Sequence, residues 1–502
     1  MIPPVQSVGR RMATGAAWMV GFKLIERSIG LISTIVLARL LLPEDFGLVA
    51  MATSVIAVAE LLQAFSFDVA LIQNQEATRE DYDSAWTLNI LLAAGCAVFL
   101  AAAAYPMSVF YGDHRVESVI YCLALGLFAQ GFENIGIVAF RKELTLHKDF
   151  WFLLAKKIVA FTITVSCALY MRNYWALIIG MVSSRFVGVG LSYLVHPYRP
   201  LLSLARASAL VHFSKWLLIT NALGVARSRT ADIIVGHMAG AHALGLFTMS
   251  YEISNLPTTE LSAPINRAVF PGYAALSSDT NALGHSVLRV MSMILLLTIP
   301  AAFGIAMVAE SLVDALLGSK WTGAIPLIQV LAIFGLVSSF QSNLGFVFVA
   351  KRQARFITFW SIAMFLLQLP LVIIGVYLSG TTGAAVGLLA SVVIPLPFVI
   401  RAVSRLVGLR AADWGAIAWR PVISAMIMGV VLWGWLSIAS PGSNFSASSL
   451  FTLLSSISLG TVSYCLSVLA LWILAGRPVG SESYLFERIG VLISRARGKL
   501  RD

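Results

Sequence analysis

Long apolar runs separated by short polar segments account for most of this 502-residue chain. About 20 apolar residues in a helix cross the hydrocarbon core of a bilayer, and windows of about 19 residues locate such runs. Fourteen runs result: residues 16–38, 46–67, 86–105, 118–140, 150–170, 175–194, 216–238, 244–265, 290–308, 324–349, 356–378, 384–400, 422–438 and 450–474. The pattern predicts an all-α polytopic membrane protein with 14 transmembrane helices.

The composition supports this prediction. Apolar residues make up 59% of the chain and charged residues only 12%, whereas ordinary soluble domains have about 45–50% and about 25%. The net charge of +11 fits cytoplasmic loops beside anionic lipid better than a nucleic-acid partner. All four cysteines lie inside apolar runs, so we expect neither disulfides nor a metal site, and no cofactor.

The distribution of basic residues predicts the orientation. Lys and Arg collect in alternate connecting segments, which places both termini in the cytoplasm by the positive-inside rule. The first run is long and contains charges, so we read it as a retained span and not as a cleaved signal. The predicted outer turns contain only four basic residues: Arg39, Arg115, Arg172 and Lys320.

A weak internal repeat appears when the chain is shifted by 198 residues. Gly47 then falls on Gly245 and Met51 falls on Met249. Six spans per unit preserve orientation, so this is a parallel repeat with a pseudo-two-fold axis along the membrane normal.

The repeat predicts how the chain is organised. Two pseudo-symmetric six-helix bundles are followed by two additional helices and a basic amphipathic tail that lies on the anionic inner leaflet. The expected boundaries are 1–200 and 201–405 for the bundles, 406–475 for the additional helices and 476–502 for the tail. A substrate path would run between the two bundles.

Charged side chains inside the apolar runs are the candidate site residues, because each costs about 2.5–3.5 kcal/mol at mid-membrane unless it faces water or a partner. The candidate substrate-binding residues are Lys23, Arg27, Arg227 and Arg229. The candidate ion-coupling residues are Glu26, Glu60, Glu133, Asp232 and Glu252. A structural alternative stays open for both sets: Arg229 and Asp232 are three residues apart and can form an intrahelical ion pair, and acids beside amides can join helices.

No motif for catalysis is present. The sequence lacks a phosphate-binding GxxxxGK[ST] loop, an HExxH pair, a CxxC pair and a nucleophile elbow. The predicted outer turns are short, whereas a membrane polymerase or glycosyltransferase would be expected to have a large outer loop with catalytic acids. We therefore predict that the chain is not an enzyme.

Two segments carry a family resemblance. Residues 38–49, ARLLLPEDFGLV, and residues 139–150, AFRKELTLHKDF, resemble the turn after the first helix and the loop after the fourth in the Wzx-like polysaccharide flippases. These belong to the multidrug/oligosaccharidyl-lipid/polysaccharide (MOP) exporter superfamily. Arg27 stands twelve residues before Arg39, which resembles the first-helix arginine of the related lipid II flippases.

The resemblance implies a MATE/MOP-like fold and a function. We expect a bacterial inner-membrane flippase that moves undecaprenyl-pyrophosphate-linked oligosaccharides by alternating access, for exopolysaccharide or lipopolysaccharide synthesis. The expected partners are this lipid-linked oligosaccharide, membrane lipids, the polysaccharide polymerase and chain-length machinery, and a coupling proton or sodium ion. The alternatives are a MATE-like cation-coupled drug antiporter and, less favoured, a membrane polymerase or ligase.

Overall fold

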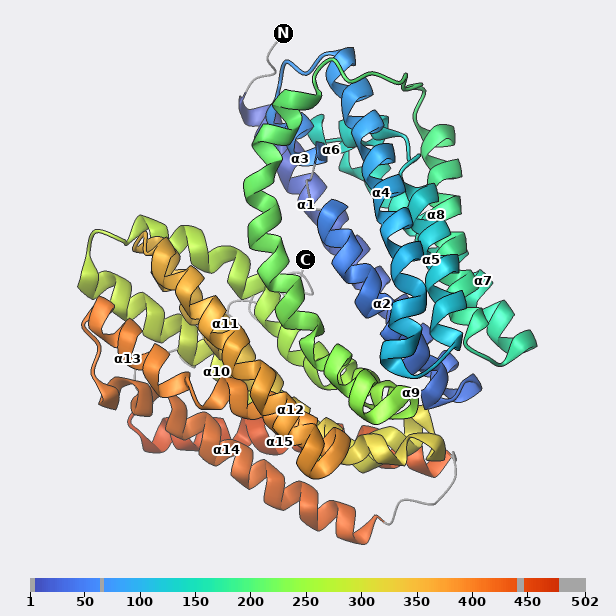
Figure 1. Ribbon diagram of the computed structural model, residues 1–502. Coiled ribbons are helices and arrows are strands. Elements are labelled where there is room, and N and C mark those ends of the chain that lie inside the picture. The colour runs from blue at the N-terminus through green and yellow to red at the C-terminus, as the bar shows by residue number, and fades with distance from the viewer. Residues whose placement is uncertain (1–4, 64–66, 440–446, 478–502) are drawn as a thin grey trace, which may run out of the picture. The chain divides into compact units, whose positions relative to one another are not determined.

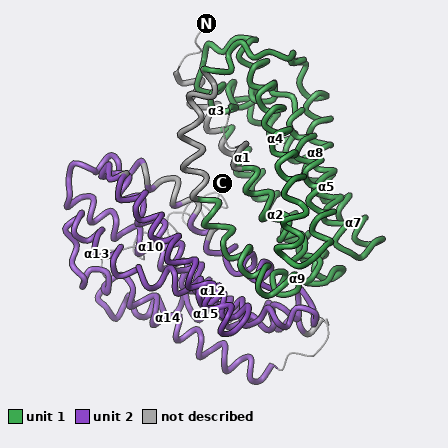
Figure 2. Tube along the Cα trace, in the orientation of Figure 1, with its two compact units in different colours: residues 1–245 green, residues 246–502 purple. Residues whose placement is uncertain are grey.

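The computed structural model describes residues 5–63, 67–439 and 447–477, and every regular element in these residues is helical (Figure 1). The chain divides into two compact units, Met1–Gly245 and Leu246–Asp502 (Figure 2). The prediction of an all-α polytopic protein is confirmed. Residues 478–502, most of the predicted amphipathic tail, lie outside the described residues.

The first unit contains the helices up to the middle of α9. They are α1 (Val5–Leu40), α2 (Pro43–Gln63), α3 (Phe67–Gln73), α4 (Arg79–Tyr111), α5 (Arg115–Gln130), the 3₁₀ turn η1 (Ile135–Val138), α6 (Ala139–Lys142), α7 (Leu146–Met171), α8 (Trp175–Val195) and the first part of α9 (Ala207–Ala275).

The second unit continues from α9 to the C-terminal helices. Its elements are α10 (Thr280–Leu312), the π-helical turn η2 (Val313–Leu317), the 3₁₀ helix η3 (Ser319–Ala324), α11 (Ile325–Ala350), α12 (Ala354–Val393), α13 (Leu396–Val407), α14 (Ala411–Ile438) and α15 (Ala447–Leu474).

Two of the longest helices join predicted apolar runs: α9 contains the runs 216–238 and 244–265, and α12 contains the run 356–378 and the start of the run 384–400. α9 has non-helical backbone at Gly240 (φ 82°, ψ 179°), and α12 at Ser379 and Gly380. Positive φ at Gly240 and Gly380 (φ 59°) is tolerated because glycine lacks a Cβ. Among the described residues, nine helices are long and apolar enough to cross a membrane, or ten if one bent pair counts as a span. Fourteen crossings stay a prediction.

The bent pair lies in the predicted run 118–140, which is interrupted instead of straight. α5 ends at Gln130, and the helical segment Ile135–Lys142 leaves it at 69°. Asn134 stabilises the new direction, since its Oδ1 accepts a hydrogen bond from Gly136 N (2.9 Å) and its Nδ2 donates to Tyr198 O (2.7 Å). This is an N-cap interaction in the middle of an apolar run.

The connection between α8 and α9, residues 196–206, is held along the start of α4. Asp83 accepts hydrogen bonds from Leu201 N (2.8 Å) and from the Tyr198 hydroxyl (2.7 Å). Ser203 N and Arg206 N donate to hydroxyl groups of the same helix. Burial and the hydrogen bond to Asp83 raise the pKa of Tyr198, so the hydroxyl, which is protonated at neutral pH in any case, stays a donor at higher pH than an ordinary tyrosine. The connection is therefore bound to the first unit.

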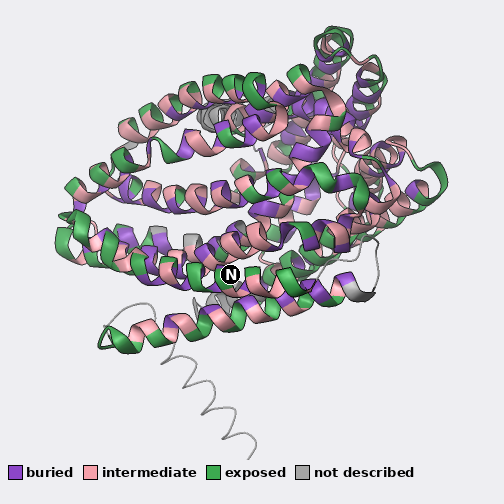
Figure 3. Cartoon of the chain, turned by 90° about the horizontal axis from the view of Figure 1, so that it is seen from below, coloured by how far each residue is buried: buried purple, intermediate pink, exposed green. Residues whose placement is uncertain are grey.

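The helices have buried and exposed sides (Figure 3). The first unit buries residues such as Leu48, Met51 and Ile120, whereas large apolar side chains on the outward faces of other helices are exposed, for example Val98 and Trp433. Such positions would be unfavourable in water but suit contact with lipid tails. The burial pattern agrees with a membrane-embedded protein.

We predict that Asp83→Ala lowers the free energy of unfolding by about 1–3 kcal/mol, because it removes the carboxylate that accepts hydrogen bonds from the part-buried donors Leu201 N and Tyr198 Oη. Thermal unfolding of the purified protein in detergent measures the change. Glu76→Ala, at an exposed position near the same helix, is the control and should leave the midpoint unchanged. Equal midpoints for both variants would contradict the anchoring role of Asp83.

Candidate functional site

The charges predicted near the middle of the first helix lie on an accessible side of α1. Lys23 Nζ is 2.7 Å from Glu26 Oε2, and these side chains are 60% and 31% exposed. Arg27 is exposed on the same helix. Glu26 therefore binds Lys23, and the cations of α1 are within reach of a ligand from outside the helix bundle.

Glu60, a predicted ion-coupling residue near the end of α2, is paired with a cation of α8. Arg185 Nη2 donates to Glu60 Oε1 at 2.9 Å, and the Arg185 side chain is 14% exposed against 48% for Glu60. Arg185 Nη1 is buried and has no hydrogen-bond partner among the described residues. The more buried member of this pair is the cation.

Glu133, the second predicted acid of the first unit, lies in the bend after α5 and faces a cation of α7. Lys156 Nζ is 3.6 Å from Glu133 Oε2, and both side chains are about four-fifths buried, at 22% and 19% exposed. The two predicted acids thus each meet a cation from another helix.

Glycines make room for both cations. A Cβ on Gly188 of α8 would lie 2.7 Å from Lys156 Nζ, and one on Gly126 of α5 would lie 3.3 Å from Arg185 Cδ. Arg185 and Gly188 are three residues apart, so the two ion pairs lie one turn apart on the same side of α8. We call Glu60, Arg185, Lys156 and Glu133 the polar seam, since they join α2, α5, α7 and α8 inside the first unit.

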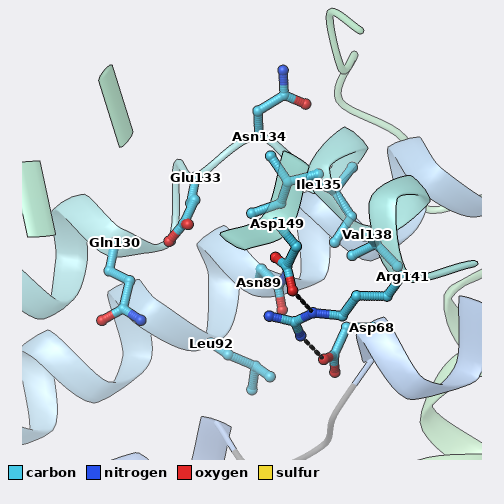
Figure 4. A pocket seen from close by; sticks show the side chains of 12 residues that line it. Asp68, Asn89, Leu92, Gln130, Glu133, Asn134, Ile135, Val138, Arg141 and Asp149 are labelled. Atoms are coloured by element: carbon cyan, nitrogen blue, oxygen red, sulfur yellow. Dashed lines mark hydrogen bonds and ion pairs between the residues drawn. The ribbon is translucent and has the colours of Figure 1, made fainter. Parts of the chain in front are cut away.

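A polar pocket of about 340 Å³ opens beside the seam, lined by Glu133 and by residues of α3 to α7 (Figure 4). Arg141 lies between two carboxylates there, with its Nε 3.0 Å from Asp149 Oδ2 and its Nη1 3.7 Å from Asp68 Oδ2. Gln130 at the end of α5 and Glu133 in the bend after it also line the pocket. The bend therefore creates a polar cavity inside an otherwise apolar bundle. In the part of the chain that the structure describes, no group of His, Cys, Asp and Glu side chains has the arrangement of a metal site.

The remaining predicted residues lie on α9. Arg229 Nη1 is 3.2 Å from Asp232 Oδ2 along the helix, which is the intrahelical pair that the spacing allows. Arg227 is partly buried, two residues earlier, and Glu252 is exposed in the second unit. The predicted residues are thus distributed over several places, and only Glu60 and Glu133 belong to the seam.

Sequence analysis overlooked Arg185 and Lys156, although both lie inside predicted spans. Arg185 stands at the middle of the run 175–194, where a cation is as costly as Arg27 is in the first run. The sequence therefore contained a signal for this site, a cation in the middle of an apolar run. The Arg141–Asp149 pair was less visible, because it lies in a segment that reads as a basic loop.

The sequence profile of a family described as "Polysaccharide biosynthesis protein" matches residues 36–326, more than half of the chain. This chain belongs to that family. The match to the polysaccharide biosynthesis proteins covers α2 to α8, the polar seam and both segments that carried the resemblance.

Individual relatives of this polysaccharide biosynthesis protein support the same family assignment. It is 24% identical over 395 residues to the lipopolysaccharide biosynthesis protein WzxC of Escherichia coli K12, covering 76% of this chain and 79% of WzxC. It is 22% identical over 336 residues to the succinoglycan biosynthesis transport protein ExoT of Rhizobium meliloti, covering 66% and 67%. The predicted Wzx-like relationship is confirmed.

Solved structures identify the fold. The lipid II flippase MurJ in an inward closed conformation superposes with a TM-score of 0.72 at 12% identity, over 92% of this chain and all of that one. An inward-facing multidrug transporter of the MATE family, in the MOP superfamily, reaches 0.57 at 15% identity over 76% and 95%. The predicted MATE/MOP-like fold is confirmed, as is the prediction that this protein is not an enzyme.

We predict an asymmetric response when the Glu60–Arg185 pair is broken. Glu60→Leu leaves the largely buried Arg185 cation without its carboxylate, and an uncompensated buried charge is strongly destabilising. Arg185→Leu leaves a half-exposed carboxylate that water can solvate, so its cost is smaller. Thermal unfolding of both variants and of the double variant tests this order. A larger loss for Arg185→Leu than for Glu60→Leu would contradict the assignment.

Proposed function

We propose that this protein is a flippase of the bacterial inner membrane that moves undecaprenyl-pyrophosphate-linked oligosaccharides from the cytoplasmic to the periplasmic leaflet. Its product would serve exopolysaccharide or lipopolysaccharide assembly. The observation that carries the proposal is the family match over residues 36–326. The fold it has in common with a lipid II flippase supports the same class of substrate, a lipid with a diphosphate head group.

The head group would bind the cations of α1. A diphosphate is recognised by charge-assisted hydrogen bonds, and arginine can bind two of its oxygens at once. Lys23 and Arg27 are exposed, whereas Arg185 and Lys156 are largely buried against carboxylates. Arg227 and Arg229 would form a second contact on α9, with Arg229 shared with Asp232.

Transport would follow alternating access, with the bundles 1–200 and 201–405 rocking about a central path and both termini in the cytoplasm. A coupling proton or sodium ion would act at the carboxylates. Glu60 and Glu133 could bind the coupling ion only by releasing Arg185 and Lys156, their partners in the polar seam. Binding of a proton at either carboxylate would therefore loosen the seam. Asp232 stands in the same relation to Arg229.

A deletion strain tests the proposed substrate. Loss of the protein should cause lipid-linked oligosaccharide to accumulate on the cytoplasmic side of the inner membrane, as measured by extraction and enzymatic accessibility in oriented vesicles. Accumulation on the periplasmic side would point to the polymerase alternative. Normal turnover of the oligosaccharide together with hypersensitivity to cationic drugs would point to the drug antiporter.

We predict that Arg27→Ala abolishes polysaccharide export while the amount of protein in the membrane stays normal. Arg27→Lys should keep partial activity, because lysine retains the charge but not the two-pronged geometry. Lys23→Ala should have a milder effect. Lys320→Ala, an exposed cation of a predicted outer turn, is the control and should export normally. If Arg27→Ala also exports normally, the head-group site is elsewhere, and Arg227 is the next residue to test.

A further inference from the structure

The polar pocket at the bend after α5 is formed by the first unit alone and has the size of a small-ligand site. Its volume of about 340 Å³ is near the lower end of the usual range for such sites, about 300–1,000 Å³. Asp149 in the pocket is almost completely buried, whereas the side chains of Arg141 and Asp68 are 44% and 41% exposed. The pocket therefore has a buried interior and an accessible mouth, with room for one ring-shaped ligand and not for a long oligosaccharide.

The polar groups of the pocket include both hydrogen-bond donors and acceptors. Asn89 of α4 and Gln130 of α5 line it with partly buried amides (Figure 4). Carboxylates only accept, the Arg141 guanidinium only donates, and an amide does both. A hydroxyl group also donates and accepts at the same atom. Among common ligand groups, several hydroxyls on one ring match this set well.

The charges of the pocket disfavour an ionic ligand. Three carboxylates, those of Asp68, Glu133 and Asp149, line it together with Arg141. A phosphate or another anion would meet this surplus of negative charge, and like charges brought together are unfavourable. A cation would have to displace Arg141 from the buried Asp149, at the cost of breaking an ion pair. An uncharged ligand avoids both costs.

Aliphatic side chains complete the pocket. They come from α4 and from η1: Leu92, Ile135, Ile137 and Val138. A sugar ring presents hydroxyl groups at its edge and C–H groups on its faces, so it can satisfy the polar and the aliphatic lining at once. Ligand sites commonly combine apolar walls with a few placed polar groups in this way.

The pocket also lies close to the proposed head-group cations. The first turn of α7 contributes Asp149 to the pocket, and the next residue, Phe150, packs on α1. The Phe150 ring centroid is 4.9 Å from that of Trp18 and 6.3 Å from that of Phe22. Phe22 directly precedes Lys23. The start of α7 therefore connects the pocket with the α1 segment that carries the cations, at the end of the unit that the basic residues predict to be cytoplasmic.

We propose that this pocket binds one uncharged sugar ring of the lipid-linked oligosaccharide while Lys23 and Arg27 hold the diphosphate. The inference rests on the proposed function and names the part of the substrate that the first unit recognises. The carboxylates accept hydrogen bonds from the ring hydroxyls, and the amides of Asn89 and Gln130 both donate and accept. A diphosphate is common to all such lipids, so the pocket is where one oligosaccharide is distinguished from another.

Protection of a cysteine in the pocket tests the class of ligand. In purified protein whose four native cysteines are replaced, Ile137→Cys places a thiol on the aliphatic lining. The probe is the free oligosaccharide that mild acid releases from the lipid-linked intermediates of the producing strain, and it should slow maleimide labelling in a saturable way. Gln75→Cys is the control, because it is exposed near the same end but does not line the pocket. Leu92→Cys replaces Ile137→Cys if that variant does not fold.

Two further probes separate the alternatives. Inorganic pyrophosphate tests for an anion site, and sodium chloride compared with choline chloride tests for a cation site. Protection by either salt without protection by the oligosaccharide would overturn the proposal. So would labelling that none of the probes slows, or equal protection at Gln75→Cys.

The amides provide a second test. Asn89→Leu and Gln130→Leu nearly preserve side-chain size but remove the hydrogen-bonding groups. Each should raise the oligosaccharide concentration for half-maximal protection by about tenfold, as for the loss of one or two hydrogen bonds, and should lower export at a normal amount of protein. Gln75→Leu is the matched control. An unchanged half-maximal concentration in both folded variants would contradict the assignment of the amides.

The protection assay needs no transport, so the two proposals fail separately. Protection by the oligosaccharide, together with its normal turnover in the deletion strain, would support the sugar site and reject the proposed flippase. Accumulation of lipid-linked oligosaccharide in the deletion strain, without protection in the pocket, would do the opposite.

Discussion

The packing of the first unit depends on the free-energy cost of placing charged side chains among apolar helices. Arg185 and Lys156 lie inside predicted spans, where an unpaired cation is strongly unfavourable, and each is compensated by a carboxylate from another segment, Glu60 of α2 and Glu133 of the bend after α5. The pairs hold α2, α5, α7 and α8 in one arrangement. Replacing a buried ion pair by apolar residues of similar volume is often neutral for stability, so these pairs do not by themselves account for the stability of the unit.

Glycines, which have no side chain, are as important as charged residues in this fold. Gly126 and Gly188 provide the space in which Arg185 and Lys156 cross neighbouring helices, and Gly47 and Gly245 allow two backbones to meet. Lipid offers no hydrophobic driving force between helices, so close backbone packing and polar contacts have to hold them together.

These features divide the charges of the first unit into two kinds. Those of the polar seam are largely neutralised in place and define the shape of the bundle. Lys23 and Glu26 of α1 form a pair near the surface, and Arg27 on the same helix is exposed. The bend at Asn134 adds a polar cavity beside the seam, so that Glu133 both pairs with Lys156 and lines this cavity.

The sequence alone determined the class of the protein. Runs such as 150–170 and 175–194 became α7 and α8 because a chain in lipid has to satisfy its backbone hydrogen bonds within each helix, and residues 38–49 and 139–150 were enough to suggest the family. It also indicated the turns at Gly240 and Gly380, where apolar runs are interrupted. Only the tertiary structure decided which charges are paired, that Asn134 bends the fourth run, and that Gly47 meets Gly245. These outcomes depend on which helices are neighbours, and the periodicity within one helix carries no information about what packs against it.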